Sequence, residues 1–339
     1  MVSTLATTPP WPSAPDGASG RRTRMAWYAA VARWAPSKHN TQPWRFVARE
    51  VSLEFWADPL RILPATDPHR REMVISLGAA VHLARVAAHA TGHDVAVTLL
   101  PHGGGGPAAT ITELGPRQPS PDDLDLLRAI PKRRTDRGPL DSDPLAPNLP
   151  FLMQSAASAQ GCSLRLVSSP GDRLTLADLV QRADRLLLRR GSADRDLALW
   201  LREPTDRRRD GVPSDHTRGA AASQRAEFVQ RDFSTPTSRP AQNRAGRDHP
   251  HVGVLCTPGD GMRDWLSAGQ AVAAVLLRAT VAGANASYVN QPIEQVAIRA
   301  ELRDQLQLDG FAQLVLRVGV GGDITPTPRR HLHDLIYQP

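Results

Sequence analysis

The feature that most constrains the fold is a segment that occurs twice in the chain, 191 residues apart. Residues 76–81 (S-L-G-A-A-V) correspond to residues 267–272 (S-A-G-Q-A-V), and the same spacing relates Gly92 to Gly283. Both copies show an alanine-rich helical pattern that ends at the glycine, which supplies the left-handed residue that helix C-termini favour. A short strand pattern and a proline follow in each copy. We therefore predict a duplicated unit built around two equivalent long helices.

A second correspondence needs a different spacing, because the second copy contains an insertion. Residues 35–47 match residues 156–167, in each case the end of a helix followed by a strand. The spacing of about 120 leaves roughly 70 extra residues between the first strand and the long helix of the second copy. Residues 174–190 and 197–201 have helical patterns, whereas the polar stretch at about 203–250 has none. We interpret that stretch as a lid-like insert, with a disordered insert as the alternative.

The composition limits the classes of protein to consider. At 339 residues the chain exceeds a usual single domain, so two units with their own cores are expected. The net charge is +7, but the 39 arginines are scattered through helical patterns, which disfavours a nucleic-acid partner. No apolar run approaches the length of a membrane span, so no membrane partner is expected. Cys162 and Cys256 lie far apart, which favours a reducing cytoplasm over a disulfide framework or a metal site.

A polar, turn-forming loop joins the first helical pattern to the first strand pattern. Its sequence, at residues 35–46, is A-P-S-K-H-N-T-Q-P-W-R-F. Pro36 ends the helix, because proline lacks an N–H and restricts the residue before it. Ser37, Asn40 and Gln42 then offer side-chain and backbone donors close together. Such a loop suits a flat ligand with many acceptors, for example a flavin ring, although an ordinary polar connector would have a similar composition.

Two arginine-rich segments are candidates for binding a phosphate. In the segment K-R-R-T-D-R, Arg133 and Arg137 are four residues apart and face one side of a turn, with the Thr135 hydroxyl between them. Two guanidinium forks and a hydroxyl can grip a phosphate, while a solvated basic linker is the alternative. Near the C-terminus, the segment P-T-P-R-R fixes an extended chain that aims Arg329 and Arg330. An ordinary basic tail is the alternative there.

The loop motif A-P-S-x-x-N-x-Q-P-W resembles the flavin loop of the FMN-dependent nitroreductase family. It is most similar to the Acg-like branch, in which two nitroreductase-type halves are fused in one chain. The resemblance implies an α+β, nitroreductase-like fold, duplicated in tandem so that one chain mimics the usual homodimer. In this family one subunit supplies the flavin loop and its partner supplies the phosphate grip. The second copy has S-A-Q-G at residues 158–161 in place of the polar loop, so one site per chain is expected.

The resemblance also implies which residues hold FMN. The flavin loop would contribute five residues. The arginine-rich segment would contribute three that bind the phosphate, with threonine in place of the usual serine, and the C-terminal segment would contribute two arginines. Two more would lie near flavin N5, in a loop that lacks the acidic-Gly element usual in the family. The predicted cofactor-binding residues are Pro36, Ser37, Lys38, Asn40, Gln42, Arg133, Thr135, Arg137, Asn290, Gln291, Arg329 and Arg330. No catalytic acid or base and no metal is implied, because the flavin carries the hydride chemistry.

The resulting hypothesis is an FMN-dependent oxidoreductase that passes a hydride from NAD(P)H through FMN to a small-molecule electron acceptor. The alternative is an FMN-binding or sequestering protein with a lid over the flavin and little or no reductase activity; a biosynthetic dehydrogenase also stays open. We expect a mobile tail at residues 1–20, a first half at 21–130 and a second half at 131–339. We further expect a cytoplasmic monomer with a pseudo-dimeric fold, with a homodimer as the alternative.

Overall fold

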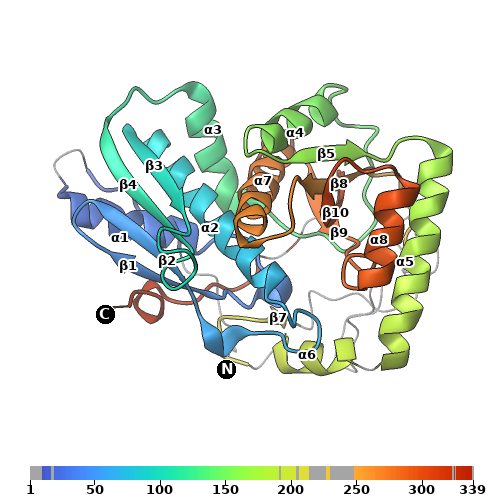
Figure 1. Cartoon of the computed structure of the whole chain (residues 1–339). Coiled ribbons are helices and arrows are strands. Elements are labelled where there is room, and N and C mark those ends of the chain that lie inside the picture. The colour runs from blue at the N-terminus through green and yellow to red at the C-terminus, as the bar shows by residue number, and fades with distance from the viewer. Residues whose placement is uncertain are drawn as a thin grey trace, which may run out of the picture.

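The computed structural model describes residues 10–16, 19–190, 192–203, 206–213, 227–229, 248–322, 324 and 326–337. It shows a mixed α+β protein with two antiparallel four-stranded sheets, and two long helices lie between them (Figure 1). The predicted α+β class is therefore confirmed. Much of the predicted lid-like insert, at 204–205, 214–226 and 230–247, lies outside the described residues.

The first sheet has the strand order β1-β2-β4-β3 and is built from the N-terminal third of the chain. Its strands are β1 (Trp44–Ala48), β2 (Ser52–Ala57), β3 (His93–Leu99) and β4 (Ala109–Pro116). Its helices are α1 (Arg21–Ala32), α2 (Arg71–Ala90) and α3 (Pro121–Ala129), with single 3-10 turns at Lys38–Asn40, Pro59–Arg61 and Ile130–Lys132. Alternate residues of β2 are buried, and the rings of Phe46 and Phe55 meet edge to face at 5.5 Å. This sheet therefore rests one face on the helices.

The second sheet has the order β5-β8-β10-β9 and is covered on both faces. Its strands are β5 (Ser163–Leu166), β8 (His251–Thr257), β9 (Asn285–Tyr288) and β10 (Phe311–Gly319). Its helices are α4 (Leu149–Ser158), α5 (Pro170–Arg190), α7 (Met262–Val281) and α8 (Val296–Gln305). Nearly every residue of β8 and β10 is buried, because α4 and α7 pack on one face and α5 and α8 on the other. Helix α6 (Ser192–Trp200) and the short strands β6 (Leu201–Arg202) and β7 (Val212–Pro213) follow α5.

Helices α2 and α7 are the two helices predicted to correspond, and they cross at two glycines. Residues 71–90 and 262–281 have the same length and the 191-residue spacing, and the glycines two residues beyond each helix have φ values of 82° and 79°. A Cβ atom on Gly78 would lie 2.1 Å from the Leu266 carbonyl oxygen, and one on Gly269 would lie 2.0 Å from that of Ile75. Gly78 corresponds to Gly269 and Ile75 to Leu266 at the same spacing. Each helix thus makes the same backbone contact with the other.

Helix α2 is also long and apolar enough to cross a membrane by length and composition alone. However, 89% of its most apolar stretch is buried inside the molecule, where it packs against α1, α3 and α7. Core helices pass the same test, so the helix carries no argument for a membrane.

The two halves are interleaved at the chain ends. The Phe46 N–H donates to the Leu335 carbonyl oxygen (2.8 Å), and the Tyr337 N–H donates to that of Phe46 (2.7 Å). The C-terminal segment, which contains a 3-10 turn at Leu332–Asp334, therefore runs alongside β1 of the first sheet (Figure 1). Near the other end, the ring of Trp11 packs on Trp34 at 5.4 Å, although this residue belongs to the predicted tail. The C-terminal segment thus pairs with the first sheet, although it follows the last strand of the second.

Candidate functional site

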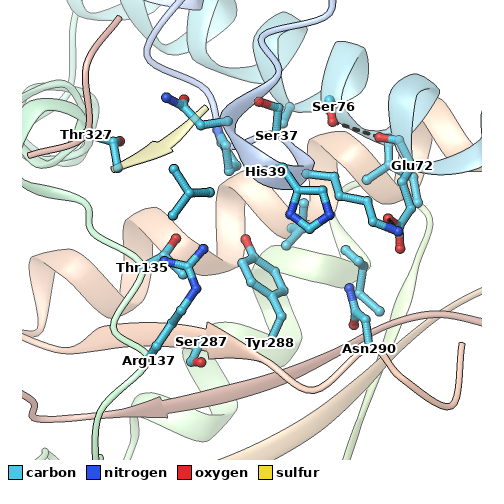
Figure 2. A pocket seen from close by; sticks show the side chains of 18 of the residues that line it. Ser37, His39, Glu72, Ser76, Thr135, Arg137, Ser287, Tyr288, Asn290 and Thr327 are labelled. Carbon is cyan, nitrogen blue, oxygen red and sulfur yellow. Dashed lines mark hydrogen bonds and ion pairs between the residues drawn. The ribbon is translucent and has the colours of Figure 1, made fainter. Parts of the chain in front are cut away.

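A pocket lies where the flavin-loop segment, α2, α7, β9 and the C-terminal segment meet (Figure 2). Ten of the twelve predicted cofactor-binding residues line it: Pro36, Ser37, Lys38, Asn40, Arg133, Thr135, Arg137, Asn290, Gln291 and Arg329. They come from four separate stretches of sequence, so the fold brings together residues that are up to about 290 positions apart. Gln42 and Arg330 do not line the pocket.

The loop at residues 36–43 has an unusual backbone. His39, Asn40 and Gln42 have φ values of 49°, 53° and 49°, in the left-handed region. This region costs non-glycine residues roughly 1–2 kcal/mol each, and such residues concentrate at functional sites. The Ser37 hydroxyl oxygen accepts a hydrogen bond from the Gln42 N–H (2.9 Å), which holds the loop in shape. The loop is therefore built to present its residues to the pocket.

The Asn40 side chain ties the loop to two distant segments. Its amide nitrogen donates to the carbonyl oxygens of Gly211 (2.9 Å) and Pro328 (3.1 Å), and its amide oxygen accepts from Arg329 Nη1 (3.0 Å). The Gly211 N–H in turn donates to the Asn40 carbonyl oxygen (3.1 Å). Asn40 thus fixes the wall of the pocket, and its polar atoms are occupied by the protein.

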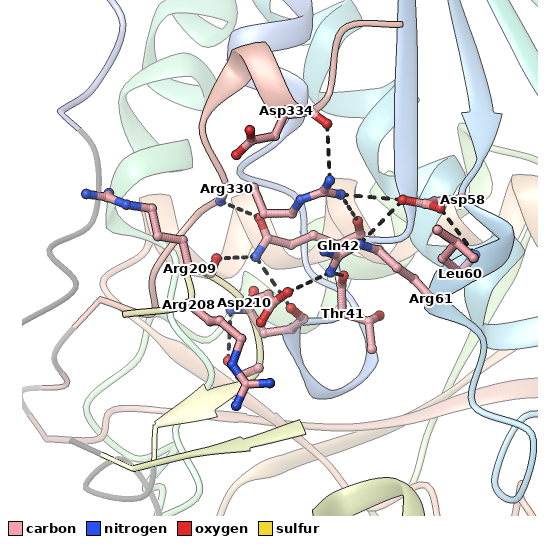
Figure 3. Close-up of polar contacts among 12 residues, drawn as sticks. Thr41, Gln42, Asp58, Leu60, Arg61, Arg208, Arg209, Asp210, Arg330 and Asp334 are labelled. Atoms are coloured by element: carbon pink, nitrogen blue, oxygen red, sulfur yellow. Dashed lines mark hydrogen bonds and ion pairs between the residues drawn. The ribbon is translucent and has the colours of Figure 1, made fainter. Parts of the chain in front are cut away.

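Gln42 and Arg330 lie behind the loop, as Figure 3 shows. The Gln42 side-chain oxygen accepts from the Arg330 N–H (2.9 Å), and its side-chain nitrogen donates to the Arg209 carbonyl oxygen (2.8 Å). The Arg330 guanidinium turns to the Asp58 carboxylate (3.7 Å). Both residues were predicted to bind the cofactor; in the structure they lie outside the pocket lining, where they support the loop.

One described part of the insert, residues 206–213, reaches across to the first sheet and its loops. Asp210 forms an ion pair with Arg61 at 2.8 Å (Figure 3). It forms a second with Arg202, also at 2.8 Å, and Val212 lines the pocket. Just before it, the Asp196 carboxylate of α6 accepts hydrogen bonds from the Thr66 N–H and hydroxyl (2.7 and 2.8 Å). This segment therefore forms one side of the pocket mouth and holds the flavin loop from outside.

The arginine-rich segment is extended, although the spacing of its arginines was interpreted as a turn. Thr135 pairs with Ala286 of β9, and the Asp136 N–H donates to the Ala286 carbonyl oxygen (2.8 Å). In an extended chain, every second residue projects to the same side. Arg133, Thr135 and Arg137 consequently all line the pocket, so the predicted common face is present although its cause differs.

Arg133 and Arg329 lie at one end of the pocket and make that end cationic. Their exposed fractions are 7% and 4%, and each donates to the Trp34 carbonyl oxygen at 3.4 Å. Within the described residues neither guanidinium pairs with a carboxylate, and both Nε atoms are buried without a hydrogen-bond partner. Burial lowers the pKa of both groups, and the neighbouring Arg133 lowers that of Arg329 further. Two buried like charges of this kind call for an anion.

Arg137 and Arg134 add to the same cationic end. Burial lowers the pKa of Arg137 to about 10, partly opposed by Asp136, and burial together with Arg133 lowers the pKa of Arg134. Both residues line the pocket. This end is therefore strongly positive, with guanidinium groups that suit a phosphate.

The other end of the pocket contains paired charges. Lys38 Nζ lies 2.7 Å from a Glu72 carboxylate oxygen and 3.1 Å from one of Glu294, and it donates to the Thr66 carbonyl oxygen (3.2 Å). Arg71 pairs with Glu72 from the far side at 3.2 Å. Burial raises the pKa of Glu72, while Lys38 and Arg71 oppose that shift. The Lys38 ammonium, which was predicted to bind the cofactor, is thus held by two carboxylates.

An apolar wall connects the two ends of the pocket. It consists of Ile75 and Ala79 of α2, Val272 of α7, Val212 and Leu314. A planar aromatic ring could rest on such a surface, with its polar edges toward the polar residues that line the pocket. The pocket therefore has a cationic end, an apolar wall and an end with paired charges.

Several lining residues were not found from the sequence. Asn290 and Gln291 are in the pocket as predicted, although their side chains bind the Val315 N–H (2.9 Å) and the Val229 carbonyl oxygen (3.0 Å). Glu294, at the end of the same loop, was missed because Gln295 follows it where the expected element has glycine. The other missed lining residues with polar side chains are His39, Glu72, Ser76, Arg134, Ser287, Tyr288 and Thr327.

The fold and the site define an α+β protein with a phosphate-compatible pocket between two interlocked halves. No protein-family profile matches the chain. A Mycobacterium tuberculosis protein provisionally named NAD(P)H nitroreductase Rv3131 is 32% identical over 315 residues, which cover 90% of this chain and 88% of the relative. A second protein from the same organism, provisionally named NAD(P)H nitroreductase acg, is 28% identical over 318 residues, which cover 89% of this chain and 92% of the relative. The uncharacterised protein Rv3127, also from that organism, is 28% identical over 311 residues, which cover 89% of each chain.

The chain therefore belongs to the NAD(P)H nitroreductase family, in its Acg-like branch. The family inferred from the flavin-loop motif is confirmed, and with it a nitroreductase-type oxidoreductase acting on a small molecule.

Proposed function

We propose that the chain binds FMN in the pocket and transfers a hydride from NAD(P)H through FMN to a small-molecule electron acceptor. The observation that carries the proposal is the cationic end, where Arg133 and Arg329 are buried without a carboxylate partner among the described residues. A phosphate dianion there would pair with both guanidinium groups. Without an anion the two buried charges are unfavourable, so an anion should be bound tightly.

The remaining lining residues fit the rest of an FMN molecule. The ring would rest on the apolar wall, and the flavin loop would border it from the opposite half of the chain. When bound, the flavin supplies the hydride chemistry. The protein would hold the ring, keep bulk water from one face through residues 206–213, and place the Glu72–Lys38–Glu294 group at the far end.

We also propose that the chain is a tandem duplication that keeps one site. The matching bounds of α2 and α7 and their reciprocal glycine contacts support a common origin of the two copies. The pocket takes its loop from the first copy and its arginine-rich segment from the second. On this proposal the chain completes its own site as a monomer and needs no partner subunit for it.

The test uses Arg133, whose side chain makes a single hydrogen bond (3.4 Å) in the described structure. We expect the wild type to bind FMN with a flavin absorbance spectrum, and Arg133→Met to bind it about 100-fold more weakly, because a charge-assisted fork is lost. The FMN-free variant should unfold at the same temperature as the FMN-free wild type or higher, because an unpaired buried charge is removed. Arg128→Met, exposed on α3, serves as the matched control.

A colourless wild-type protein that takes up no added FMN would overturn the proposal. Equal FMN affinity of the wild type and the Arg133 variant would remove the phosphate assignment.

A second candidate function is the sequestration of FMN without appreciable turnover. It is favoured by residues 206–213, which border the pocket through Val212 and hold the flavin loop through Gly211. Rapid mixing of the FMN-loaded protein with NADH or NADPH separates the two candidates. Bleaching of the flavin absorbance within seconds supports the reductase, whereas flavin that stays oxidised under anaerobic conditions supports sequestration.

A further inference from the structure

Tyr288 is a pocket residue whose hydroxyl has no hydrogen-bond partner among the residues that the structure describes. It ends β9, where its backbone pairs with Leu316 of β10, and its side chain projects into the pocket (Figure 2). Its hydroxyl forms no hydrogen bond to any residue that the structure describes, and the same holds for the hydroxyls of Thr135 and Ser287 nearby. The hydroxyls of Tyr288 and Thr135 therefore lie on the same side of the pocket, whereas Ser287, the neighbouring residue of the strand, points the other way (Figure 2).

The surroundings of Tyr288 are those of an anion site. Figure 2 shows its hydroxyl on the side of Arg137 and Thr135, with Asn290 on the other side of the phenol ring. Burial raises the pKa of Tyr288, and the positive charges of Arg133 and Arg137 partly oppose this shift. The phenol is thus protonated at neutral pH and is available as a donor.

Tyr288 is half-buried and its hydroxyl lines the pocket, so it can donate to a ligand that accepts from it there. The guanidinium groups beside the hydroxyl select an acceptor with negative charge. A phosphate has three oxygens with several lone pairs each, so it can accept from the arginines and from hydroxyls at the same time.

We propose that Tyr288 is a specificity-determining residue, which donates a hydrogen bond to the phosphate of the bound flavin beside Arg137 and Thr135. This inference rests on the proposed function, since it requires FMN in the pocket. The inference goes beyond the proposed function, because the Tyr288 hydroxyl would help the pocket to distinguish a phosphorylated flavin from riboflavin.

The experiment compares two flavins and two tyrosine variants. Dissociation constants for FMN and riboflavin are measured by quenching of flavin fluorescence with the FMN-free protein, its Tyr288→Phe variant and its Tyr337→Phe variant. The second variant loses the same hydroxyl from an exposed residue and is the matched control. We expect Tyr288→Phe to weaken FMN binding about 10- to 100-fold, as for a charge-assisted hydrogen bond, with riboflavin binding unchanged.

The outcomes are distinct. Unchanged FMN binding in Tyr288→Phe, or an equal loss for both flavins, overturns the inference and leaves the proposed function in place. A wild-type protein that binds no FMN overturns both. Far-ultraviolet circular dichroism of the variant checks that a loss of binding does not come from unfolding.

Discussion

The crossing of α2 and α7 gives a quantitative test of how the two halves are held together. In the Gly78→Ala variant, the new Cβ atom would lie 2.1 Å from the Leu266 carbonyl oxygen and 3.0 Å from the Gly269 Cα atom. Carbon–oxygen contacts start at about 3.3 Å, so the helices must separate by about 1.2 Å. Both obstructing atoms belong to helix backbones, which cannot turn aside as a side chain could.

The magnitude follows from two opposing effects. Forcing an extra methyl group into a packed core costs about 1–3 kcal/mol, and the rigid backbone on both sides places Gly78→Ala at the upper end. Replacing glycine by alanine inside a helix stabilises the helix by about 1 kcal/mol, which offsets part of this cost. We therefore expect the free energy of unfolding to fall by about 2 kcal/mol, measured from urea unfolding curves by linear extrapolation. Gly269→Ala should lose a similar amount, because its contact with Ile75 is equivalent.

The double variant makes the test sharper. Once one methyl group has pushed the helices apart, the second enters a gap that already exists, so the two losses should add to less than their sum. Gly171→Ala is the control, because a Cβ atom at this position on α5 would meet nothing within 4 Å. A Gly78→Ala variant within 0.5 kcal/mol of the wild type, or two fully additive losses, would refute the reciprocal contact.

Three further predictions follow from buried polar and reactive groups. Lys38→Met should lower the free energy of unfolding by about 3 kcal/mol at pH 7, measured by urea unfolding, because Glu72 and Glu294 lose their shared cation. Without Lys38 the pKa of buried Glu72 rises further, so this loss should be smallest at a pH where Glu72 is protonated in both proteins and should grow as the pH rises through its raised folded-state pKa; a loss independent of pH would contradict the assignment. Asp210→Asn should speed amide hydrogen exchange of residues 206–213 and of the flavin loop by at least tenfold, because two ion pairs are lost; unchanged exchange would contradict the coupling. Burial raises the thiol pKa of Cys162 and Cys256 to about 12, so a thiol-reactive dye should label neither in the native protein and both in urea.

The elements that could be predicted from the sequence are those set by local patterns. The alanine-rich pattern and its terminal glycine located both α2 and α7, and the order of residues in the flavin loop indicated the family. Pro36 was predicted to end the first helix. The predicted loop does follow Pro36, but α1 already ends at Ala32. Each of these signals depends on residues that are neighbours along the chain.

The features that could not be predicted depend on contacts between distant segments. A four-residue spacing of arginines fits a helical turn and an extended chain equally well, and only pairing with Ala286 decides for the extended form. Lys38 was assigned to the cofactor because it lies in the loop motif, but its ammonium is bound by carboxylates 34 and 256 residues away. Tyr288 was missed for a related reason, because nothing local marks a strand-end tyrosine as a donor beside arginines.

The strained flavin loop links the two candidate functions in a way that decides how they can be tested. Three left-handed residues make the loop unfavourable by itself, so other segments must hold it. Asn40 is bound by Gly211 and by Pro328, and Gln42 by the Arg209 carbonyl. Removing the insert to expose the flavin would therefore also remove half of the loop's support, and FMN should be lost rather than made reactive. Point substitutions at Val212, which borders the pocket without holding the loop by its side chain, are the cleaner perturbation. If Val212→Gly raises the rate of flavin reduction at constant FMN affinity, residues 206–213 act as a cover. If a chain without the insert binds FMN as tightly as the wild type, the loop does not depend on them.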